Sequence, residues 1–263
     1  MTTTTDTTPN TAPSKIAVIT GGSRGLGRNA ALQLARRGID SVVTYRSQQG
    51  EAQAVVDEIH SLGARAAALQ LDVGDSGSFA AFAQALRQAL RQHWGRDRID
   101  HLVNNAGMGT HASLAETTEA QFDELMRVHL KGPFFLTQAL LPMINDGGSV
   151  LNVSSGLARF SLPGYGAYAT MKGGIEVLTR YMAKEFGARG IRVNTLAPGA
   201  IETDFGGGAV RDQAGLNQFV ASVTALGRAG LPDDIGRVVA SLLSDDSRWV
   251  NAQRVEASGG MFV

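Results

Sequence analysis

The sequence predicts an α/β protein built on an open, doubly wound parallel sheet of about seven strands, with helices on both faces. Three observations support this fold class. Short apolar runs alternate with amphipathic segments, and the runs are hydrophobic at nearly every position, as strands buried on both faces are. The connections between them are short. The first strand–helix turn is rich in glycine, which favours the open sheet over its rival, a TIM barrel.

The first half of the chain alternates strand and helix. A strand is expected from Lys15 to Thr20, and a helix follows in which apolar residues recur at helical spacing from Leu26 to Ala35, with Gly38 as its C-terminal cap. The same pattern predicts a strand at 41–45, a helix at 51–62, a strand at 66–71, a helix at 79–94 and a strand at 99–103.

The second half continues with two helices between about 119 and 144, a strand at 149–153, a helix from about 164 to 186 and a strand at 191–196. After Pro198 the pattern loosens. Three adjacent glycines at 206–208 predict a mobile substrate lid over about 203–225. A helix at 232–244 and a short strand at 254–257 end the chain.

Length and composition agree with one domain. The chain has 263 residues, of which 43% are hydrophobic and 18% charged, so it can bury a sizeable core. No linker rich in proline or serine interrupts residues 14–263, which we expect to form a single domain. Residues 1–13 are rich in threonine and lack the apolar region of a signal peptide, so we expect a disordered tail.

Charge and cysteine content exclude several classes of function. Basic and acidic residues number 24 each, so no excess charge would attract nucleic acid or an anionic membrane. The chain has no cysteine, which excludes disulfides and thiolate chemistry and fits a reducing compartment. No apolar stretch is long enough to cross a bilayer, and the histidines show no metal-ligand spacing. We therefore expect a cytoplasmic protein without a nucleic-acid, membrane or metal partner.

A glycine-rich turn follows the first expected strand. In Thr20-Gly-Gly-Ser-Arg-Gly-Leu-Gly27 the backbone can approach a pyrophosphate, and the start of the next helix offers free N–H groups. A tight turn without a ligand would also use glycines. The position between a strand and a helix favours a dinucleotide site.

Two further motifs carry a family resemblance. Asn104-Asn-Ala-Gly107 follows the fourth expected strand, and Tyr168-x3-Lys172 lies on the long helix. With the glycine-rich turn, their order resembles the short-chain dehydrogenase/reductases over nearly the whole chain, and the spacings are similar to those of 3-oxoacyl-carrier-protein reductases and glucose dehydrogenases. The resemblance implies a Rossmann-type fold, a nicotinamide cofactor and a homotetramer.

The resemblance also implies which residues bind the cofactor. They are Gly21, Ser23, Arg24, Gly25, Leu26 and Gly27 in the glycine-rich turn; Tyr45, Arg46 and Ser47 after the second strand; Asp72 and Val73 at the adenine; Asn104, Ala106 and Gly107; Tyr168 and Lys172 at the nicotinamide ribose; and Pro198, Gly199, Ile201 and Thr203. Asp72 has an alternative role as the cap of a neighbouring turn.

The residues after the second strand predict which nicotinamide cofactor is used. Thr44-Tyr-Arg-Ser47 lacks the acidic residue that holds the ribose 2′-hydroxyl of NAD. Arg46 and Arg24 instead offer guanidinium groups to a 2′-phosphate. We expect NADP(H), with NAD(H) as a weaker alternative; two solvated surface arginines are the competing interpretation.

Tyr168 and Lys172 are the expected centre of catalysis. Four residues apart on a helix, they share one face, and an ammonium beside a phenol lowers the phenol pKa. Tyr168 would then exchange a proton with the substrate oxygen. Ser155, thirteen residues before Tyr168 as in the family, is expected to hydrogen-bond that oxygen. Ser154, the competing candidate, is expected to bond backbone groups at the strand end.

One position departs from the family pattern. Val128-His-Leu-Lys-Gly132 carries a histidine where the family has a catalytic asparagine. In the family, the backbone carbonyl of that residue holds a water that links the lysine to solvent, and our preferred interpretation is that His129 preserves this role. An imidazole that relays protons and a histidine packed only for structure are the alternatives.

The side chains expected around the substrate are mainly apolar, namely Leu157, Phe160, Leu162, Phe205 and Phe219. They favour a hydrophobic or mixed-polarity carbonyl substrate, and Arg159 is the one candidate for binding a carboxylate. The sequence thus predicts an NADPH-dependent carbonyl reductase. An alcohol or sugar dehydrogenase working in the oxidative direction, or a non-catalytic NADP(H)-sensing protein, would carry the same motifs.

Overall fold

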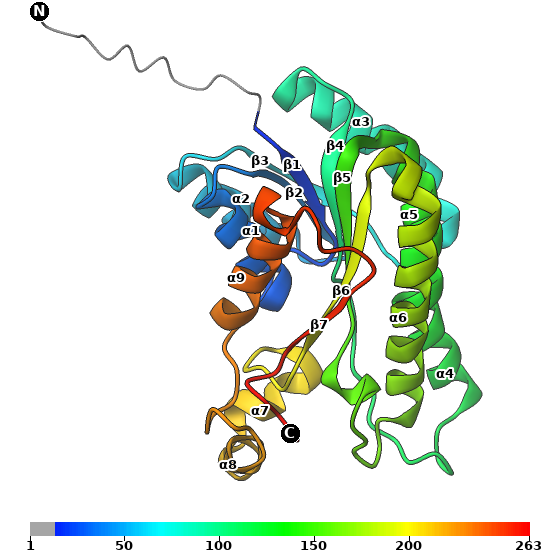
Figure 1. Cartoon of the computed structure of the whole chain (residues 1–263), viewed down its shortest axis with the longest axis vertical. Helices are drawn as coiled ribbons and strands as arrows, with labels where there is room; N and C mark the ends of the chain where they lie inside the picture. The colour runs from blue at the N-terminus through cyan, green and yellow to red at the C-terminus, as the bar shows by residue number, and fades with distance from the viewer. Residues whose placement is uncertain (1–13) are drawn as a thin grey trace, which may run out of the picture.

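The computed structural model describes residues 14–263, so the predicted tail at 1–13 lies outside the described part. Seven strands form one parallel sheet in the order β3-β2-β1-β4-β5-β6-β7 (Figure 1). They are β1 (Ile16–Ile19), β2 (Asp40–Tyr45), β3 (Ala66–Gln70), β4 (Ile99–Asn104), β5 (Ile144–Val153), β6 (Arg192–Pro198) and β7 (Arg254–Ala257). This order confirms the open doubly wound sheet and excludes the TIM barrel.

Helices cover both faces of the sheet (Figure 1). One face carries α1 (Gly25–Ala35), α2 (Gln49–Ser61) and α9 (Pro232–Leu243); the other carries α3 (Phe79–Trp94), α5 (Gly132–Leu140) and α6 (Gly166–Phe186), with α4 (Glu119–Met126) beside α6. The short helices α7 (Ala209–Asp212) and α8 (Ala214–Ser222) lie at the end of the molecule that holds the C-terminus. Within residues 14–263, no helix has the length and apolar character needed to span a membrane.

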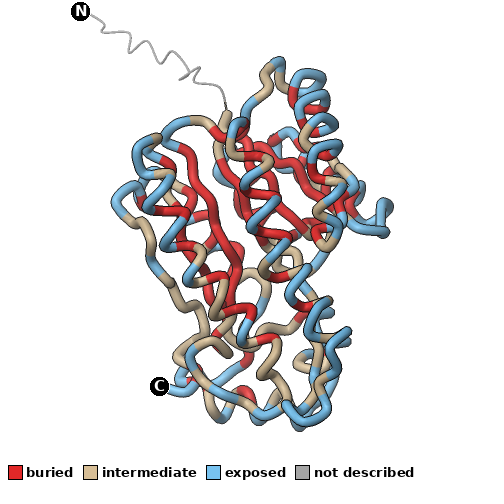
Figure 2. Tube along the Cα trace, turned by 90° about the vertical axis from the view of Figure 1, so that its right-hand side faces the viewer, coloured by how far each residue is buried: buried red, intermediate tan, exposed pale blue. Residues whose placement is uncertain are grey.

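Strand β1 shows why the strands are apolar at successive positions. Ala17 and Ile19 pack into the core under α1 and α9, whereas Ile16 and Val18 pack into the core under α3 and α5. Successive strand side chains point to opposite faces, so a strand covered on both sides must be hydrophobic throughout. Figure 2 shows the result, with the buried residues concentrated in the sheet and more exposed segments at the end near the C-terminus.

The structure adds to or corrects the expected elements in three places. Strand β5 begins at Ile144 rather than at Ser149, because its first residues form a polar stretch with Gly147 at a φ of +77° that hides the strand from the sequence pattern. Helices α4 and α5 are joined by a π-helical turn over Arg127–Lys131 with no loop between them. The segment at 203–225 contains α7 and α8, which the sequence pattern did not reveal.

A buried histidine in the sheet makes stability depend on pH. His101 of β4 places Nδ1 2.7 Å from the Ser149 hydroxyl of β5, and burial lowers the pKa of His101 from 6.5 to about 4. As the pH falls, His101 is therefore protonated at a higher pH in the unfolded chain than in the folded protein. We expect the free energy of unfolding to decrease by about 2–3 kcal/mol between pH 6.5 and pH 4 on account of this residue.

Denaturant titrations at pH 7 and pH 4.5 measure this loss. His101→Asn removes the titrating group and should reduce the difference between the two pH values. His93→Gln is the matched control, because His93 is exposed and should leave the difference unchanged. An equal pH dependence in wild type and His101→Asn would contradict the assignment.

Candidate active site

The predicted cofactor residues gather where the strand order reverses. Strand β1 lies between β2 and β4, so the glycine-rich turn after β1 and the 104–107 segment after β4 are neighbours at the carboxyl ends of their strands. Crevices at this point of a doubly wound sheet bind ligands. Thr203, after β6, lies beside Gly25 and so reaches the same place from the other half of the sheet.

The glycine-rich turn has the shape of a phosphate cradle. Gly21 and Gly25 adopt φ values of +62° and +54°, which disfavour other residues. A Cβ at Gly27 would overlap the Gly21 carbonyl oxygen and lie 2.6 Å from the amide nitrogen of Asn105. At the start of α1, the Arg24 side chain makes no cap hydrogen bond and the first turn has no acidic residue. The free N–H groups at the N-terminus of α1 are therefore suited to binding a pyrophosphate.

Thr20 and Asn105 hold the two loops together. The Thr20 hydroxyl oxygen accepts the N–H groups of Asn105 and Ala106, both at 2.9 Å, while the Asn105 amide donates to the carbonyls of Thr20 at 2.9 Å and Gly21 at 3.2 Å. Thr20 belongs to the glycine-rich turn and Asn105 to the 104–107 motif, but the sequence alone predicted no role for either side chain. Their presence in two separate motifs was the only signal of this contact.

The arginines expected at a 2′-phosphate are exposed. Arg24 and Arg46 form no ion pair with an acidic side chain of residues 14–263, and the segment that ends β2 carries no carboxylate. These residues fit a group with the charge of a phosphate. Asp72, expected at the adenine, accepts the N–H of Gly74 at 2.8 Å and so caps a turn, which is its alternative role; contact with adenine stays a prediction.

The Asn104 side chain points into the fold. Its amide donates to the Asn152 side-chain oxygen at 2.8 Å and lies 3.1 Å from the Thr137 hydroxyl, and the residue is buried. A cofactor contact predicted for Asn104 would therefore have to use its backbone. Ala106 and Gly107, which follow it, are partly exposed at the carboxyl end of β4.

Ser155, Tyr168 and Lys172 come together at the end of β5. Tyr168 and Lys172 of α6 are only 7% and 5% exposed, and Lys172 Nζ lies 5.5 Å from the Tyr168 ring centroid. Lys172 Nζ also donates to the Val153 carbonyl at 2.7 Å. The Ser155 hydroxyl accepts the Leu157 N–H at 3.2 Å and lies close enough to the phenol to influence its pKa.

Burial sets the protonation of this group. It lowers the pKa of Lys172 from 10.5 to about 7 and raises the pKa of Tyr168 above its ordinary value of 10, while the neighbouring Ser155 hydroxyl opposes the rise. For the protein's own groups, desolvation of the phenolate therefore sets the direction of the Tyr168 pKa shift, and the expected lowering by Lys172 and a bound nicotinamide stays a prediction.

Ser154 has a structural role that differs from the expected one. It is buried, and its hydroxyl lies 2.7 Å from Oε1 of Glu176 and 3.1 Å from the Lys172 carbonyl oxygen. The side chain therefore ties β5 to α6 instead of bonding groups at the strand end.

His129 lies in the π-helical turn against the ring of Tyr168. It is 2% exposed, its ring stands edge-on to the tyrosine at 5.2 Å, and Nε2 lies 2.7 Å from the Met108 carbonyl oxygen. Burial, with a smaller contribution from the charge of Lys172, lowers the pKa of His129 to about 3. A neutral imidazole thus anchors the 107–108 loop beside the tyrosine.

The surroundings of Tyr168 are apolar. Met108 and Leu157 pack against the cluster of Leu125, Tyr168 and Met171, and the ring of Phe205 lies 5.8 Å from that of Tyr168. Arg159 does not face this region as a free cation, because it binds both oxygens of Glu256, at 2.8 and 2.7 Å. Arg159, the one candidate for binding a substrate carboxylate, is therefore already paired with a carboxylate of the protein itself.

Comparisons with known proteins agree with this geometry. A family model described as enoyl-(acyl carrier protein) reductase matches residues 21–262. An uncharacterized oxidoreductase of Methylorubrum extorquens is 38% identical over 247 residues, which are 94% of this chain and 97% of that protein. The hydroxynaphthalene reductase-like protein Arp2 of Metarhizium brunneum is 36% identical and covers 96% of this chain and 97% of its own.

Two solved structures are similar over the whole fold. The promiscuous reductase LugOII, which catalyses keto-reduction at C1 in lugdunomycin biosynthesis, has a TM-score of 0.90 and 36% identity, covering 95% of this chain and 98% of its own. The angucycline C-6 ketoreductase LanV, solved with bound NADP, has a TM-score of 0.90 and 34% identity, covering 94% and 95%. With its sheet order, its motifs and these matches, the chain belongs to the short-chain dehydrogenase/reductase family of oxidoreductases.

Proposed function

We propose that this protein is an NADP(H)-dependent ketone reductase in which Tyr168 is the proton donor. The group that Ser155 forms with the buried Tyr168 and Lys172 carries this proposal. NADPH, when bound, supplies a hydride to the carbonyl carbon. Tyr168 donates its proton to the carbonyl oxygen while Ser155 hydrogen-bonds the same oxygen. Lys172, with a pKa near 7, can return a proton to the phenol at neutral pH.

The substrate class that we infer is a polycyclic aromatic ketone. Met108, Leu157 and Phe205 give the tyrosine an apolar surrounding that suits a flat, hydrophobic molecule. The names of the similar proteins support the same class, since they include a hydroxynaphthalene reductase-like protein and an angucycline ketoreductase.

Oxidation of NADPH, followed by absorbance, tests the proposal. The panel should hold hydroxynaphthalene-type and angucycline-type ketones, acyl thioesters and sugars, each with NADPH and with NADH. We expect turnover of aromatic ketones with NADPH. Turnover of thioesters alone would overturn the substrate class, and tight NADPH binding without any turnover would favour a cofactor-sensing protein.

Arg46 is proposed to select NADPH. A charge-assisted hydrogen bond to the 2′-phosphate contributes about 1.5–3 kcal/mol, so Arg46→Ala should reduce the preference for NADPH over NADH by about 10- to 100-fold. The ratio of kcat/KM for the two cofactors measures this. Arg37→Ala is the matched control, because Arg37 is an exposed arginine beyond the opposite end of α1. An unchanged ratio in Arg46→Ala would show that the 2′-phosphate is bound elsewhere.

His129 is proposed to act through its backbone and through its hold on Met108, and not as a proton relay. Because the pKa of the imidazole is about 3, His129→Asn should leave the shape of the pH–rate profile unchanged between pH 5 and pH 9. We expect kcat to stay within about tenfold of wild type. Loss of one limb of the profile in His129→Asn would instead support an imidazole relay.

A homotetramer is proposed from an exposed apolar surface on α4, α5 and α6. The residues are Phe122, Met126, Phe134, Phe135, Val177 and Tyr181. A surface of this kind is typical of protein–protein contacts. Gly173 has open space beside it, whereas Gly174 already meets Leu130 of the same chain. Light scattering that gives the mass of a monomer would contradict the proposal.

Residues 203–225 are proposed to be a lid over the substrate. Gly206, Gly207 and Gly208 all have positive φ values, so the backbone turns sharply between Phe205 and α7. Phe205, at the start of this segment, is the residue that approaches Tyr168. Movement of the glycine turn would therefore carry an aromatic ring toward or away from the reacting carbonyl.

A further inference from the structure

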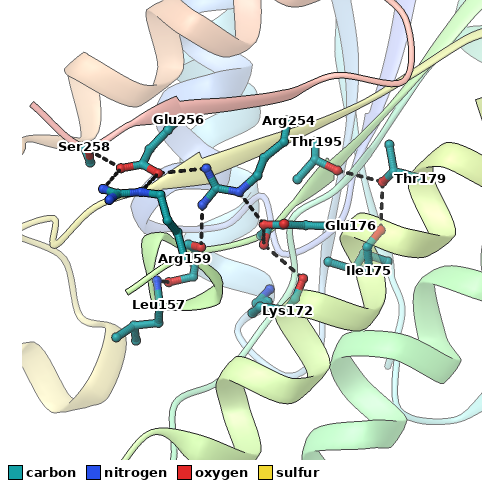
Figure 3. A network of polar contacts seen from close by, with 12 residues as sticks. Leu157, Arg159, Lys172, Ile175, Glu176, Thr179, Thr195, Arg254, Glu256 and Ser258 are labelled. Carbon is teal, nitrogen blue, oxygen red and sulfur yellow. Dashed lines mark hydrogen bonds and ion pairs between the residues drawn. The ribbon is translucent and has the colours of Figure 1, made fainter. Parts of the chain in front are cut away.

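Four charged side chains, those of Arg159, Glu176, Arg254 and Glu256, form a cluster (Figure 3). Arg254 of β7 is at its centre, with Nε 2.7 Å from Glu176 of α6 and Nη1 2.7 Å from Glu256. Arg159 completes the cluster by binding Glu256. The side chains of Arg254, Glu176 and Glu256 are 25%, 15% and 18% exposed, so solvent screens these ion pairs only in part.

Arg254 also reaches the backbone of the catalytic loop. Its Nη2 donates to the Ser155 carbonyl oxygen at 3.3 Å, and the Ala158 N–H donates to the same oxygen at 3.1 Å. The Ser155 hydroxyl accepts the Leu157 N–H. The orientation of Ser155 is therefore fixed by a short turn on one side and by the Arg254 guanidinium on the other.

Three consecutive residues at the end of β5 are each tied to another element. The contacts are Lys172 Nζ to the Val153 carbonyl oxygen (2.7 Å), Ser154 Oγ to Glu176 Oε1 (2.7 Å) and Arg254 Nη2 to the Ser155 carbonyl oxygen (3.3 Å). Because Arg254 binds Glu176 as well as Ser155, it links the helix that carries the tyrosine to the residue that presents the catalytic hydroxyl.

We propose that Arg254, together with Glu176, is a positioning residue that holds the Ser155 hydroxyl against the Tyr168 phenol. The inference rests on the proposed function, in which Ser155 hydrogen-bonds the carbonyl oxygen. Arg254 acts through Ser155 and does not touch the reacting atoms. Replacing it with methionine removes one of the two donors to the Ser155 carbonyl and leaves both glutamates without their shared cation.

A double-mutant cycle of Arg254→Met and Ser155→Ala tests this role. Arg254→Met should lower kcat for ketone reduction by about 10- to 100-fold, as misplacement of a catalytic group does, with little change in the Kd for NADPH. It should have almost no further effect when Ser155 is already alanine. Arg254→Lys keeps the positive charge but loses the several N–H donors of the guanidinium. Its kcat should lie between those of wild type and Arg254→Met. Independent, multiplicative effects of the two substitutions would overturn the inference.

Amide hydrogen exchange gives a second readout that does not need turnover. The Leu157 and Ala158 N–H groups both donate to Ser155, so Arg254→Met should speed their exchange. Arg192→Met is the matched control, because Arg192 of β6 also donates to several carbonyls but contacts none in the catalytic loop. Unchanged exchange in Arg254→Met would overturn the inference.

The two experiments also separate this inference from the proposed function. Absence of ketone turnover in the wild type would contradict the proposed function, while the exchange rates at Leu157 and Ala158 would still decide whether Arg254 holds Ser155. Normal turnover in the wild type combined with a fully active Arg254→Met variant would contradict the inference alone.

Discussion

Tyr168→Phe is expected to lower kcat for ketone reduction by about 10²- to 10⁴-fold, the contribution of a general acid. The substitution removes one oxygen from a side chain that is otherwise held by apolar contacts with Met108, Leu157 and Phe205. The fold and the affinity for NADPH should therefore stay close to those of wild type. Single-turnover measurements at saturating NADPH report the chemical step directly.

The control for this prediction lies on the same helix. Tyr181 lies thirteen residues after Tyr168 on α6 and is 65% exposed. Tyr181→Phe removes the same phenol oxygen as Tyr168→Phe. Its kcat should match that of wild type. Substantial ketone reduction by Tyr168→Phe would mean that another group protonates the carbonyl oxygen.

Gly27→Ala is expected to weaken NADPH binding by about 10- to 100-fold. The added methyl would overlap the Gly21 carbonyl oxygen and crowd the Asn105 amide, so the turn must shift away from its phosphate-binding shape. Overpacking of this kind costs about 1–3 kcal/mol. Because Asn105 also bonds Thr20, the disturbance should reach both loops of the cradle. Fluorescence titration with NADPH measures the change in Kd.

Gly50→Ala is the matched control for this substitution. A Cβ at Gly50 meets no atom within 4 Å, and the residue lies in the exposed first turn of α2. It should bind NADPH normally and gain about 0.5–1 kcal/mol of stability, because alanine favours a helix over glycine. Equal affinities of the Gly27→Ala and Gly50→Ala variants would show that the turn does not bind the cofactor.

The sequence predicted the sheet and most helices because their causes are local. Alternating burial makes strands such as β1 continuously apolar, and caps such as Gly38 mark the ends of helices. The same local logic placed Tyr168 and Lys172 on one helix face, where the structure has them. The start of β5 and the helices α7 and α8 were missed because glycines and polar residues there conceal the pattern.

The sequence alone could not predict contacts between residues that lie far apart in the chain. Arg159 is bound by Glu256, 97 residues away, and no local pattern indicates that pairing. The hydroxyl of Ser154 meets Glu176 across the interface of strand and helix. The direction of the Tyr168 pKa shift depends on how deeply the phenol is buried, and burial depth follows only from packing.

The paired amides of Asn104 and Asn152 bear on how the sheet keeps its alignment. These residues lie directly opposite each other on β4 and β5, and Thr195 is opposite Asn152 on β6. Thr179 of α6 bonds both Asn152 and Thr195, at 2.9 and 2.8 Å. A shift of register here would leave these polar groups without partners in the core, which is costly.

Such a slip of β5 by one residue would carry Ser155, three positions beyond Asn152, by about 3.3 Å. A shift of that size would move the Ser155 hydroxyl out of its place beside the Tyr168 phenol. The buried polar contacts between β4, β5, β6 and α6 therefore help to fix the register of β5, and with it the position of Ser155 in the active site.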